Sequence, residues 1–264
     1  MKTALTAEQV QSYRDDGFVV LDEFLDADEL ENWRRCTEEG IQERLKTTHL
    51  QNQGDPDSYY AQVFTQAIKL RDVHEGMRQI MDDPRLGELA ATLAGVDGIR
   101  IWHDQALVKP PFGNATAWHC DNPFWSFSSR DAISLWVALD DATLSNGCLY
   151  YLPGTHKTAT FDPTPIGANQ RDLFKIYPQW LDIEPVATPC KAGSAVLHNG
   201  LVAHGAGANM THRPRRAMTC AYMPDGATFN GRRNVLSEGY HNSLKIGDVI
   251  DKNDEVPLVW RRGG

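Results

Sequence analysis

Hydrophobic residues recur at helical spacing through the first third of the chain. A capping box at Thr6–Gln9 starts a helix that should end at Gly17. A second helix starts near Asp26, and its apolar positions keep one face as far as Leu45. Residues 59–81 also have a mostly helical pattern, with residues 73–76 as a candidate break. Asp83-Pro84 begins a further helix that should end near Gly95. A short strand is expected between the first two helices, at residues 18–21.

The pattern changes to short β-type runs from Gly98 onward. They cover residues 99–108, 117–121, 133–139, 148–152, 195–198 and 218–223. Turn signals such as Pro110-Pro111 and Pro153-Gly154 separate them. Helices followed by many short strands predict a mostly β fold with flanking helices, a double-stranded β-helix (jelly-roll or cupin-like barrel) with a helical layer.

We expect one domain over residues 1–264. Residues 1–97 would give mainly helical support, 98–224 the barrel core and 225–264 a C-terminal extension. The polar stretch 47–58 is expected to be a loop, with a lid over the site as one alternative and an ordinary surface connection as the other.

Charge and composition narrow the classes of partner. The chain has 26 Lys plus Arg against 35 Asp plus Glu, a net charge of −9, so no global basic field would recruit nucleic acid or an anionic membrane. No apolar run approaches the roughly 18 residues of a membrane span. The five cysteines lack C-x-x-C spacing, which favours reduced thiols. These features predict a cytoplasmic protein and leave its oligomeric state open.

Candidate chemistry lies in two strand-like segments that are far apart in the sequence. On an extended strand, His119 and Asp121 project to the same side because they are two residues apart. If His204 arrives from a distant strand, the three form the two-histidine, one-carboxylate triad of non-haem Fe(II) oxygenases. Arg215 follows eleven residues after His204, where a guanidinium can grip the carboxylate of a co-substrate through two hydrogen bonds.

Other histidines and aromatic residues offer alternatives. His198 is a second candidate for the distal ligand, although the Gly200 turn and the spacing to Arg215 favour His204. The adjacent pair His103-Asp104 would face opposite sides of a strand and is interpreted as structural. Phe124 and Trp125 belong either to the barrel core or to the wall of a substrate pocket.

The sequence resembles the phytanoyl-CoA dioxygenase family of Fe(II)/2-oxoglutarate oxygenases over most of its length. The matching pieces, in the family's order, are DDGFVVLDEFL, WHDQALVKPP, WHCD, SLWVALDDATLSNGCLYYLPGTHK and HGAGANMTHRPRRA. The resemblance implies that His119, Asp121 and His204 bind iron, that Arg215 binds 2-oxoglutarate, and that Lys109 and Trp136 help to line its pocket. Two positions depart from many members, which have Gln at the position of Cys120 and Ser at that of Ala206.

The expected function is therefore an oxygenase that uses Fe(II), 2-oxoglutarate and O2. It would hydroxylate an unactivated C–H bond of a small organic molecule and release succinate and CO2. A non-catalytic metal-binding or sensory barrel is the alternative, since a fold and a triad alone do not prove turnover. A zinc hydrolase shares the ligand types but gives no reason for Arg215 at its spacing.

Overall fold

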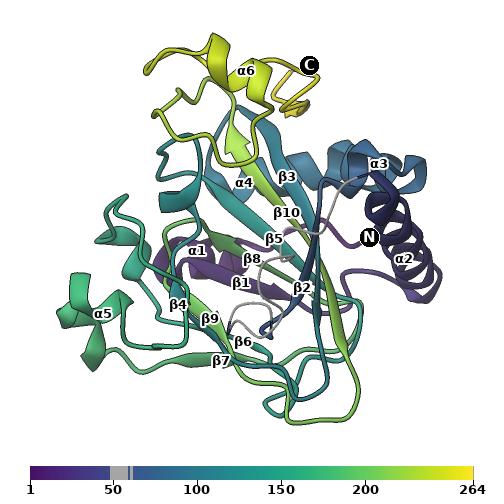
Figure 1. Cartoon of the computed structure of the whole chain (residues 1–264), viewed down its shortest axis with the longest axis vertical. Coiled ribbons are helices and arrows are strands. Elements are labelled where there is room, and N and C mark those ends of the chain that lie inside the picture. Colours follow the sequence, from purple (N-terminus) through teal and green to yellow (C-terminus); the bar gives the residue numbers. More distant parts are fainter. Residues whose placement is uncertain (48–58, 60–61, 264) are drawn as a thin grey trace.

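The computed structural model describes residues 1–47, 59 and 62–263, and it has two antiparallel sheets with helices against the larger one (Figure 1). The seven-stranded sheet has the order β1-β8-β5-β10-β3-β11, and β2 also pairs with β3. Its strands are β1 (Phe18–Leu21), β2 (Thr65–Ile68), β3 (Gly98–Lys109), β5 (Ile133–Ala138), β8 (Ala195–Asn199), β10 (Arg215–Pro224) and β11 (Leu258–Arg261). The four-stranded sheet has the order β4-β9-β6-β7, from β4 (Thr116–His119), β6 (Leu149–Tyr151), β7 (Val186–Thr188) and β9 (His204–Ala206).

The N-terminal helices begin and end where their capping residues allow. The helices are α1 (Ala7–Asp16), α2 (Ala27–Thr47), α3 (Glu75–Met81), α4 (Pro84–Ala94), α5 (Leu173–Ile176) and α6 (Glu238–Ser243). Thr6 and Gln9 form the predicted capping box of α1, and Gly17 ends the helix at a positive φ of 87°. Asp83 caps α4, with Pro84 at its first position and Gly95 at its end.

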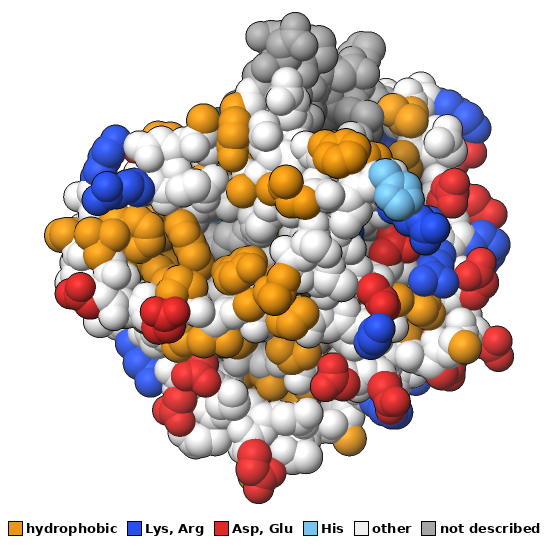
Figure 2. Space-filling model, turned by 90° about the horizontal axis from the view of Figure 1, so that it is seen from below, with side chains coloured by type: hydrophobic (Ala, Val, Ile, Leu, Met, Phe, Trp, Pro, Cys, Tyr) orange, Lys and Arg blue, Asp and Glu red, His pale blue; other side chains and the backbone are white. Residues whose placement is uncertain are grey.

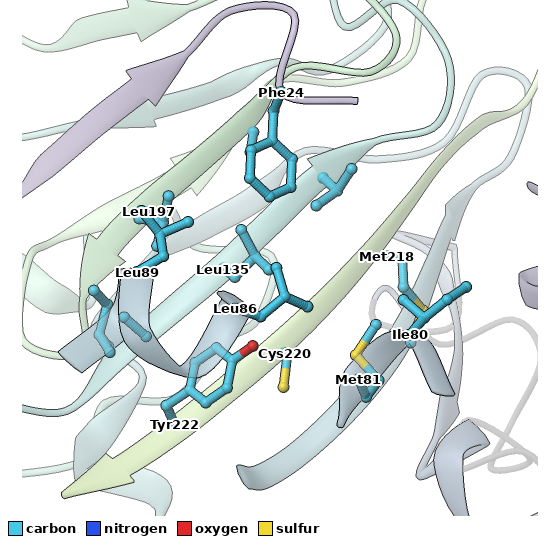
Figure 3. Close-up of a cluster of buried hydrophobic side chains, with 14 of the residues drawn as sticks. Phe24, Ile80, Met81, Leu86, Leu89, Leu135, Leu197, Met218, Cys220 and Tyr222 are labelled. Atoms are coloured by element: carbon cyan, nitrogen blue, oxygen red, sulfur yellow. The ribbon is translucent and has the colours of Figure 1, made fainter. Parts of the chain in front are cut away.

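The main core lies between the helices and one face of the large sheet. Figure 3 shows side chains of α3 and α4 packed against side chains of β5, β8 and β10. The labelled residues include Ile80, Met81, Leu86, Leu89, Leu135, Leu197 and Met218. Burying one such side chain contributes about 1.5–3 kcal/mol, so this layer fixes the sheet whose other face lines the site.

The prediction for residues 59–81 is wrong in part. Thr65–Ile68 forms strand β2 against β3, a 3-10 helix follows at Leu70–Asp72, and only Glu75–Met81 is α-helical. Pairing with β3 satisfies the backbone of β2, a tertiary interaction that overrides a local helical pattern. Lys69, at a φ of 58°, ends the strand. Most of the expected loop and possible lid, residues 48–58, lies outside the described residues.

A β-bulge in β3 changes which side chains face the small sheet. Ala221 pairs with His103 and Tyr222 with Ile101, so Trp102 is the extra residue of β3. Ile101 packs in the helix-covered core, whereas His103 on the far side of the bulge lines the cavity between the sheets. The bulge therefore aims an imidazole at the site.

The helices, the cysteines and the surface charge can be compared with what the sequence predicts. Within the described residues, no helix is both long and apolar enough to cross a membrane. The five cysteines are buried and unpaired. The face in Figure 2 has hydrophobic side chains across its centre and interspersed acidic and basic side chains along its right side, so the described part of this face is not uniformly basic.

Candidate functional site

A cavity of about 510 Å³ lies between the two sheets. Its wall includes residues of β2, β3, β5, β8 and β10 from the large sheet and of β4, β6 and β9 from the small one. This volume falls within the range of small-molecule sites. His119, Asp121, His204 and Arg215 all line it, so the sheets bring the candidate residues from the distant segments to one place.

His119, Asp121 and His204 form a cluster that can hold a metal ion. One ligand atom from each lies within 4.8 Å of the others. The Nε2 atoms of His119 and His204 lie 3.5 and 3.6 Å from the same oxygen, Oδ1 of Asp121. Their Nδ1 atoms donate to backbone carbonyls of Ala117 at 2.8 Å and Val202 at 3.1 Å. These hydrogen bonds select the tautomer whose Nε2 lone pair is free for a metal.

The strand pairing explains how the two histidines meet, but Asp121 reaches the site differently from the prediction. His119 of β4 and His204 of β9 are direct partners across the small sheet. Strand β4 ends at His119, and Asp121 has helical dihedrals, φ −75° and ψ −52°, before a 3-10 helix. The chain turns here because the Asn122 amide donates to the Gly200 carbonyl at 2.8 Å. Strand alternation was therefore the wrong reason for a grouping that the structure does contain.

The second oxygen of Asp121 is held by two side chains of the large sheet. Ser134 Oγ donates to Oδ2 at 2.9 Å, and His198 Nε2 donates to it at 3.2 Å. Tyr151 hydroxyl lies 3.0 Å from His198 Nδ1 and donates to it when Nε2 carries the proton. His198 is thus a partner of Asp121 and lies outside the three-residue cluster. Sequence reasoning considered it only as a rival ligand.

Electrostatics favour an ionised Asp121 beside a neutral His204. Burial would raise the pKa of Asp121, but its interactions with His204, His119 and His198 outweigh burial and hold the pKa well below its usual value. Burial lowers the pKa of His204 far below its usual value, and the neighbouring His119 adds to this effect. A carboxylate and a neutral imidazole are the forms that bind metal.

Arg215 presents unpaired donors in the same cavity. Its side chain is buried, and Nη2 donates to the Gly147 carbonyl at 3.1 Å. Nε and Nη1 have no hydrogen-bond partner among the described residues, and the guanidinium lies over the Trp136 ring at 5.3 Å. Burial lowers the Arg215 pKa to about 10, so the group is charged at neutral pH. A buried guanidinium with two free donors suits a carboxylate.

The residues near Arg215 differ in what they contact. Trp136 lines the cavity under the guanidinium. Lys109 is buried but is not among the cavity-lining residues, because its Nζ donates to the carbonyls of Asn114 at 2.6 Å and Val63 at 3.3 Å. Burial lowers the Lys109 pKa to about 7, and the charge of Arg215 adds to this effect. Arg216 instead pairs with Asp140 at 2.8 Å outside the cavity.

The two departures from the family pattern have different positions. Cys120 points away from the cavity into a separate apolar cluster, and its Sγ donates to the Leu201 carbonyl at 3.3 Å. Ala206 lines the cavity. Of the other candidates, Phe124 and Trp125 also line the cavity, as does His103, which the sequence interpretation had treated as structural.

Comparison with solved structures defines the class of protein. The chain is similar to the non-haem α-ketoglutarate-dependent carbocyclase SnoK from nogalamycin biosynthesis, with a TM-score of 0.81, 26% identity and 96% of each chain covered. It is also similar to the epimerase SnoN in complex with Fe³⁺, α-ketoglutarate and nogalamycin RO, with a TM-score of 0.76, 25% identity, and 96% and 97% of the two chains covered. The fold is the double-stranded β-helix of Fe(II)/2-oxoglutarate oxygenases, which confirms the predicted fold class.

The particular family follows from the sequence. The family profile described as phytanoyl-CoA dioxygenase (PhyH) matches residues 13–217, and the chain belongs to this family. A methylphosphonate hydroxylase from Gimesia maris is 30% identical over 267 residues, covering 100% of this chain and 93% of that protein. The protein is therefore an Fe(II)/2-oxoglutarate-dependent dioxygenase, with Fe(II) as cofactor and 2-oxoglutarate and O2 as co-substrates.

Proposed function

We propose that this oxygenase hydroxylates an unactivated C–H bond of a small organic molecule, with release of succinate and CO2. The observation that supports this most is the convergence of a metal-binding cluster and a buried, donor-rich Arg215 on one cavity. Fe(II) with 2-oxoglutarate and O2 supplies the oxidising chemistry, and the chain supplies geometry and exclusion of water.

His119, Asp121 and His204 would hold the iron through Nε2, Oδ1 and Nε2. Ser134 and His198 bind the other oxygen of Asp121, so they fix the carboxylate in an orientation that keeps Oδ1 directed at both histidines. Ligands held in this way need little reorganisation when the metal arrives. Three protein ligands also leave coordination positions for the co-substrates.

Arg215 would bind the remote carboxylate of 2-oxoglutarate through its two unpaired donors. Trp136 would form part of the same pocket, because its ring lies below the guanidinium. Lys109 would act from behind the wall by holding the segments at Val63 and Asn114, since its ammonium is already bonded to their carbonyls. A buried charge is tolerated when it is paired, which favours Arg215 as a dicarboxylate site.

The reaction outcome is the part of this proposal that most needs a direct test. SnoK is described as a carbocyclase and SnoN as an epimerase, so a product without added oxygen is the second candidate outcome. We expect the purified protein with Fe(II), O2 and 2-oxoglutarate to form succinate in step with a product one oxygen atom heavier than the substrate. A product of unchanged mass, or one lighter by two hydrogens, would reject hydroxylation and keep the oxygenase class. Omission of iron is the control.

A further inference from the structure

The cavity wall near the metal cluster is built largely from uncharged side chains. Its aromatic part comes from Phe64, Phe124, Trp125 and Trp136. Its neutral polar part includes Gln66, His103, Gln105 and Asn234. Among the described lining residues, Arg215 is the sole Lys or Arg and Asp121 the sole carboxylate. Since the proposed function assigns both to co-substrate and iron, the remaining wall carries no permanent charge.

His103 is a polar group of the wall whose hydrogen-bonding capacity is not all used within the chain. Its side chain is buried, and its Nδ1 has no hydrogen-bond partner among the described residues. Its ring lies edge-on to Trp125, with centroids 6.2 Å apart and planes at 87°. Burial lowers the His103 pKa to about 4, although the charge of Asp121 opposes this effect and that of Lys69 adds to it. At neutral pH the imidazole therefore offers one donor and one acceptor without charge.

Two amide side chains of the wall, those of Gln105 and Asn234, are hydrogen-bonded to other side chains. Gln105 follows His103 on the same face of β3, and its Oε1 accepts from Gln66 Nε2 at 3.0 Å. Asn234, at a φ of 41°, accepts from Trp102 Nε1 at 3.2 Å. Trp102 is the extra residue of the bulge that aims His103, so one local distortion positions both polar groups.

Several cations that neighbour lining residues in the sequence lie outside the wall. Lys69 follows the lining residue Ile68, and Arg232 and Arg233 precede the lining residue Asn234. The guanidinium of Arg232 donates to the Pro123 carbonyl, and that of Arg233 donates to the Leu236 carbonyl at 3.4 Å. Residues 48–58 and 60–61 contain no Lys or Arg in their sequence. An anion that entered beyond Arg215 would lose water without gaining an ionic partner among the described side chains of the wall, which is unfavourable.

Building on the proposed function, we propose that the part of the substrate that reaches the iron site is an uncharged ring system. Its faces pack on the aromatic side chains, and a hydroxyl or carbonyl group hydrogen-bonds to His103. Aromatic walls favour flat apolar groups, and a few fixed polar groups set orientation. Phosphonates, which carry their charge next to the reacting carbon, are excluded from this role.

A matched pair of probes tests the proposal: methyl 2-naphthoate, which is uncharged, and 2-naphthoate, which has the same ring system and a negative charge. Binding is measured by anaerobic equilibrium dialysis against the enzyme saturated with Fe(II) and 2-oxoglutarate, and retention of 2-oxoglutarate is measured in the same samples. We expect the ester to bind at least about tenfold more tightly than the carboxylate, because only the carboxylate enters the wall unpaired. Weak 2-oxoglutarate binding by the wild type would instead reject the proposed function, so the two failures are distinguishable.

Substitutions in and beside the wall test which residue is responsible for binding the ester. His103→Phe should weaken ester binding at least about fivefold while 2-oxoglutarate affinity stays within about twofold, and His103→Gln should recover part of the loss. Lys69→Met is the matched control and should leave the binding of both probes unchanged. Carboxylate binding as tight as that of the ester, binding of neither probe, or succinate formation stimulated by methylphosphonate more than by any uncharged ring compound would overturn the proposal.

Discussion

At the scale of single residues, the two histidines of the cluster are oriented in the same way. Each ring donates from Nδ1 to the backbone carbonyl two positions earlier, Ala117 for His119 and Val202 for His204. The short separation makes this hydrogen bond a consequence of local chain geometry. The Nε2 atoms are therefore directed at Asp121 before any metal binds, which is the arrangement that gives high affinity.

Replacing any one residue of the cluster should abolish iron binding. For His119→Ala, Asp121→Ala and His204→Ala we expect Fe(II) affinity to fall by at least about 100-fold and succinate formation to be lost, because each removes one of the three proposed iron ligands. Circular dichroism should show a folded protein. His212→Ala, at an exposed histidine, is the control and should retain both Fe(II) binding and succinate formation. Full iron binding by any of the three variants would show that its residue is not a ligand.

Arg215 allows a graded prediction. Arg215→Ala should weaken 2-oxoglutarate binding by about 2–5 kcal/mol because the remote carboxylate would be left buried without a partner, and Arg215→Lys should recover only part of this. Fe(II) binding should survive both changes. Isothermal titration with 2-oxoglutarate gives the affinities directly.

The neighbouring arginines are matched controls for this prediction. Arg213 is exposed, and we expect Arg213→Ala to change 2-oxoglutarate affinity by less than about twofold. Arg216 forms an ion pair with Asp140, so Arg216→Ala should lower stability and leave the affinity unchanged. Equal small effects at all three positions would contradict a co-substrate role for Arg215.

His198 should contribute to iron affinity through Asp121. His198→Ala removes the donor to Oδ2 and should weaken Fe(II) binding by about 10–100-fold, the usual cost of losing a partner of a metal ligand. Tyr151→Phe removes only the hydroxyl beside His198 Nδ1 and should cost less. Iron titrations on both variants test this order. If His198→Ala abolishes iron binding while His204→Ala retains it, His198 is the ligand.

At the scale of elements, the site depends on close contact between β4 and β9. A Cβ atom added at Gly205 would lie 2.8 Å from the Thr116 carbonyl oxygen on the paired strand. Gly205→Ala should therefore push β9 away from β4 and separate His204 from His119. We expect a loss of about 1–3 kcal/mol in unfolding free energy, the cost of overpacking, together with weaker Fe(II) binding.

Gly207→Ala is the matched control for this strand. Its added Cβ would meet Tyr150 Cε2 at 3.5 Å, Gly147 Cα at 3.6 Å and the Leu144 carbonyl oxygen at 3.9 Å, all ordinary contact distances. Thermal melting and iron titration should leave this variant close to wild type. If Gly205→Ala behaves in the same way, close contact between the strands is not what sets the spacing of the histidines.

The elements that the sequence predicted well are those with local signals. The cap of α1 and most of the longer strands were predicted because capping boxes and alternating runs lie within a few residues. Strand β2 was missed because its identity depends on pairing with β3, which is distant in the sequence. The bulge at Trp102 was missed for the same reason, since only the pairing with β10 reveals it. Because the bulge was missed, the position of His103 in the cavity wall was missed as well.

In the candidate site too, the features with local sequence signals were predicted and the contacts between distant segments were not. His119, Asp121, His204 and Arg215 were predicted from spacing and residue type, and the structure brings them to one cavity. The contacts of Ser134, Tyr151 and His198 around Asp121 were not predicted, because they join segments from three different parts of the two sheets. The available signal was that His198 lies six residues before the candidate ligand His204, and the sequence interpretation took His198 as an alternative ligand.

At the scale of the whole molecule, the large sheet separates two environments whose effects on stability oppose each other with pH. His103 faces the cavity, and its neighbour Asp104 accepts from the backbone amide of Leu70 at 2.8 Å on the helix-covered side. Burial lowers the His103 pKa to about 4 and raises the Asp104 pKa to about 7. The unfolded chain has ordinary values for both groups, so folding is linked to proton release at His103 and to proton uptake at Asp104.

The change in folding stability with falling pH has opposite signs for His103 and Asp104. As pH falls from about 6.5 to about 4, the unfolded chain protonates His103 while the folded protein does not, so this residue makes the fold progressively less stable. As pH falls from about 7 to about 4, the folded protein protonates Asp104 first, so this residue makes the fold more stable. The total pH dependence mixes both effects, and single variants are needed to separate them.

His103→Phe in the metal-free protein isolates the histidine. The difference in unfolding free energy between variant and wild type should shift in favour of the variant by about 2–3 kcal/mol as pH falls from 7 to 4.5, because Phe has no proton to bind. Asp104→Asn should shift in the opposite direction over the same range. Urea unfolding at a series of pH values, with a chelator present to remove iron, gives both differences. A His103→Phe difference that stays constant with pH would show that the imidazole titrates normally in the fold, and that the cavity around it is wetter than its burial implies.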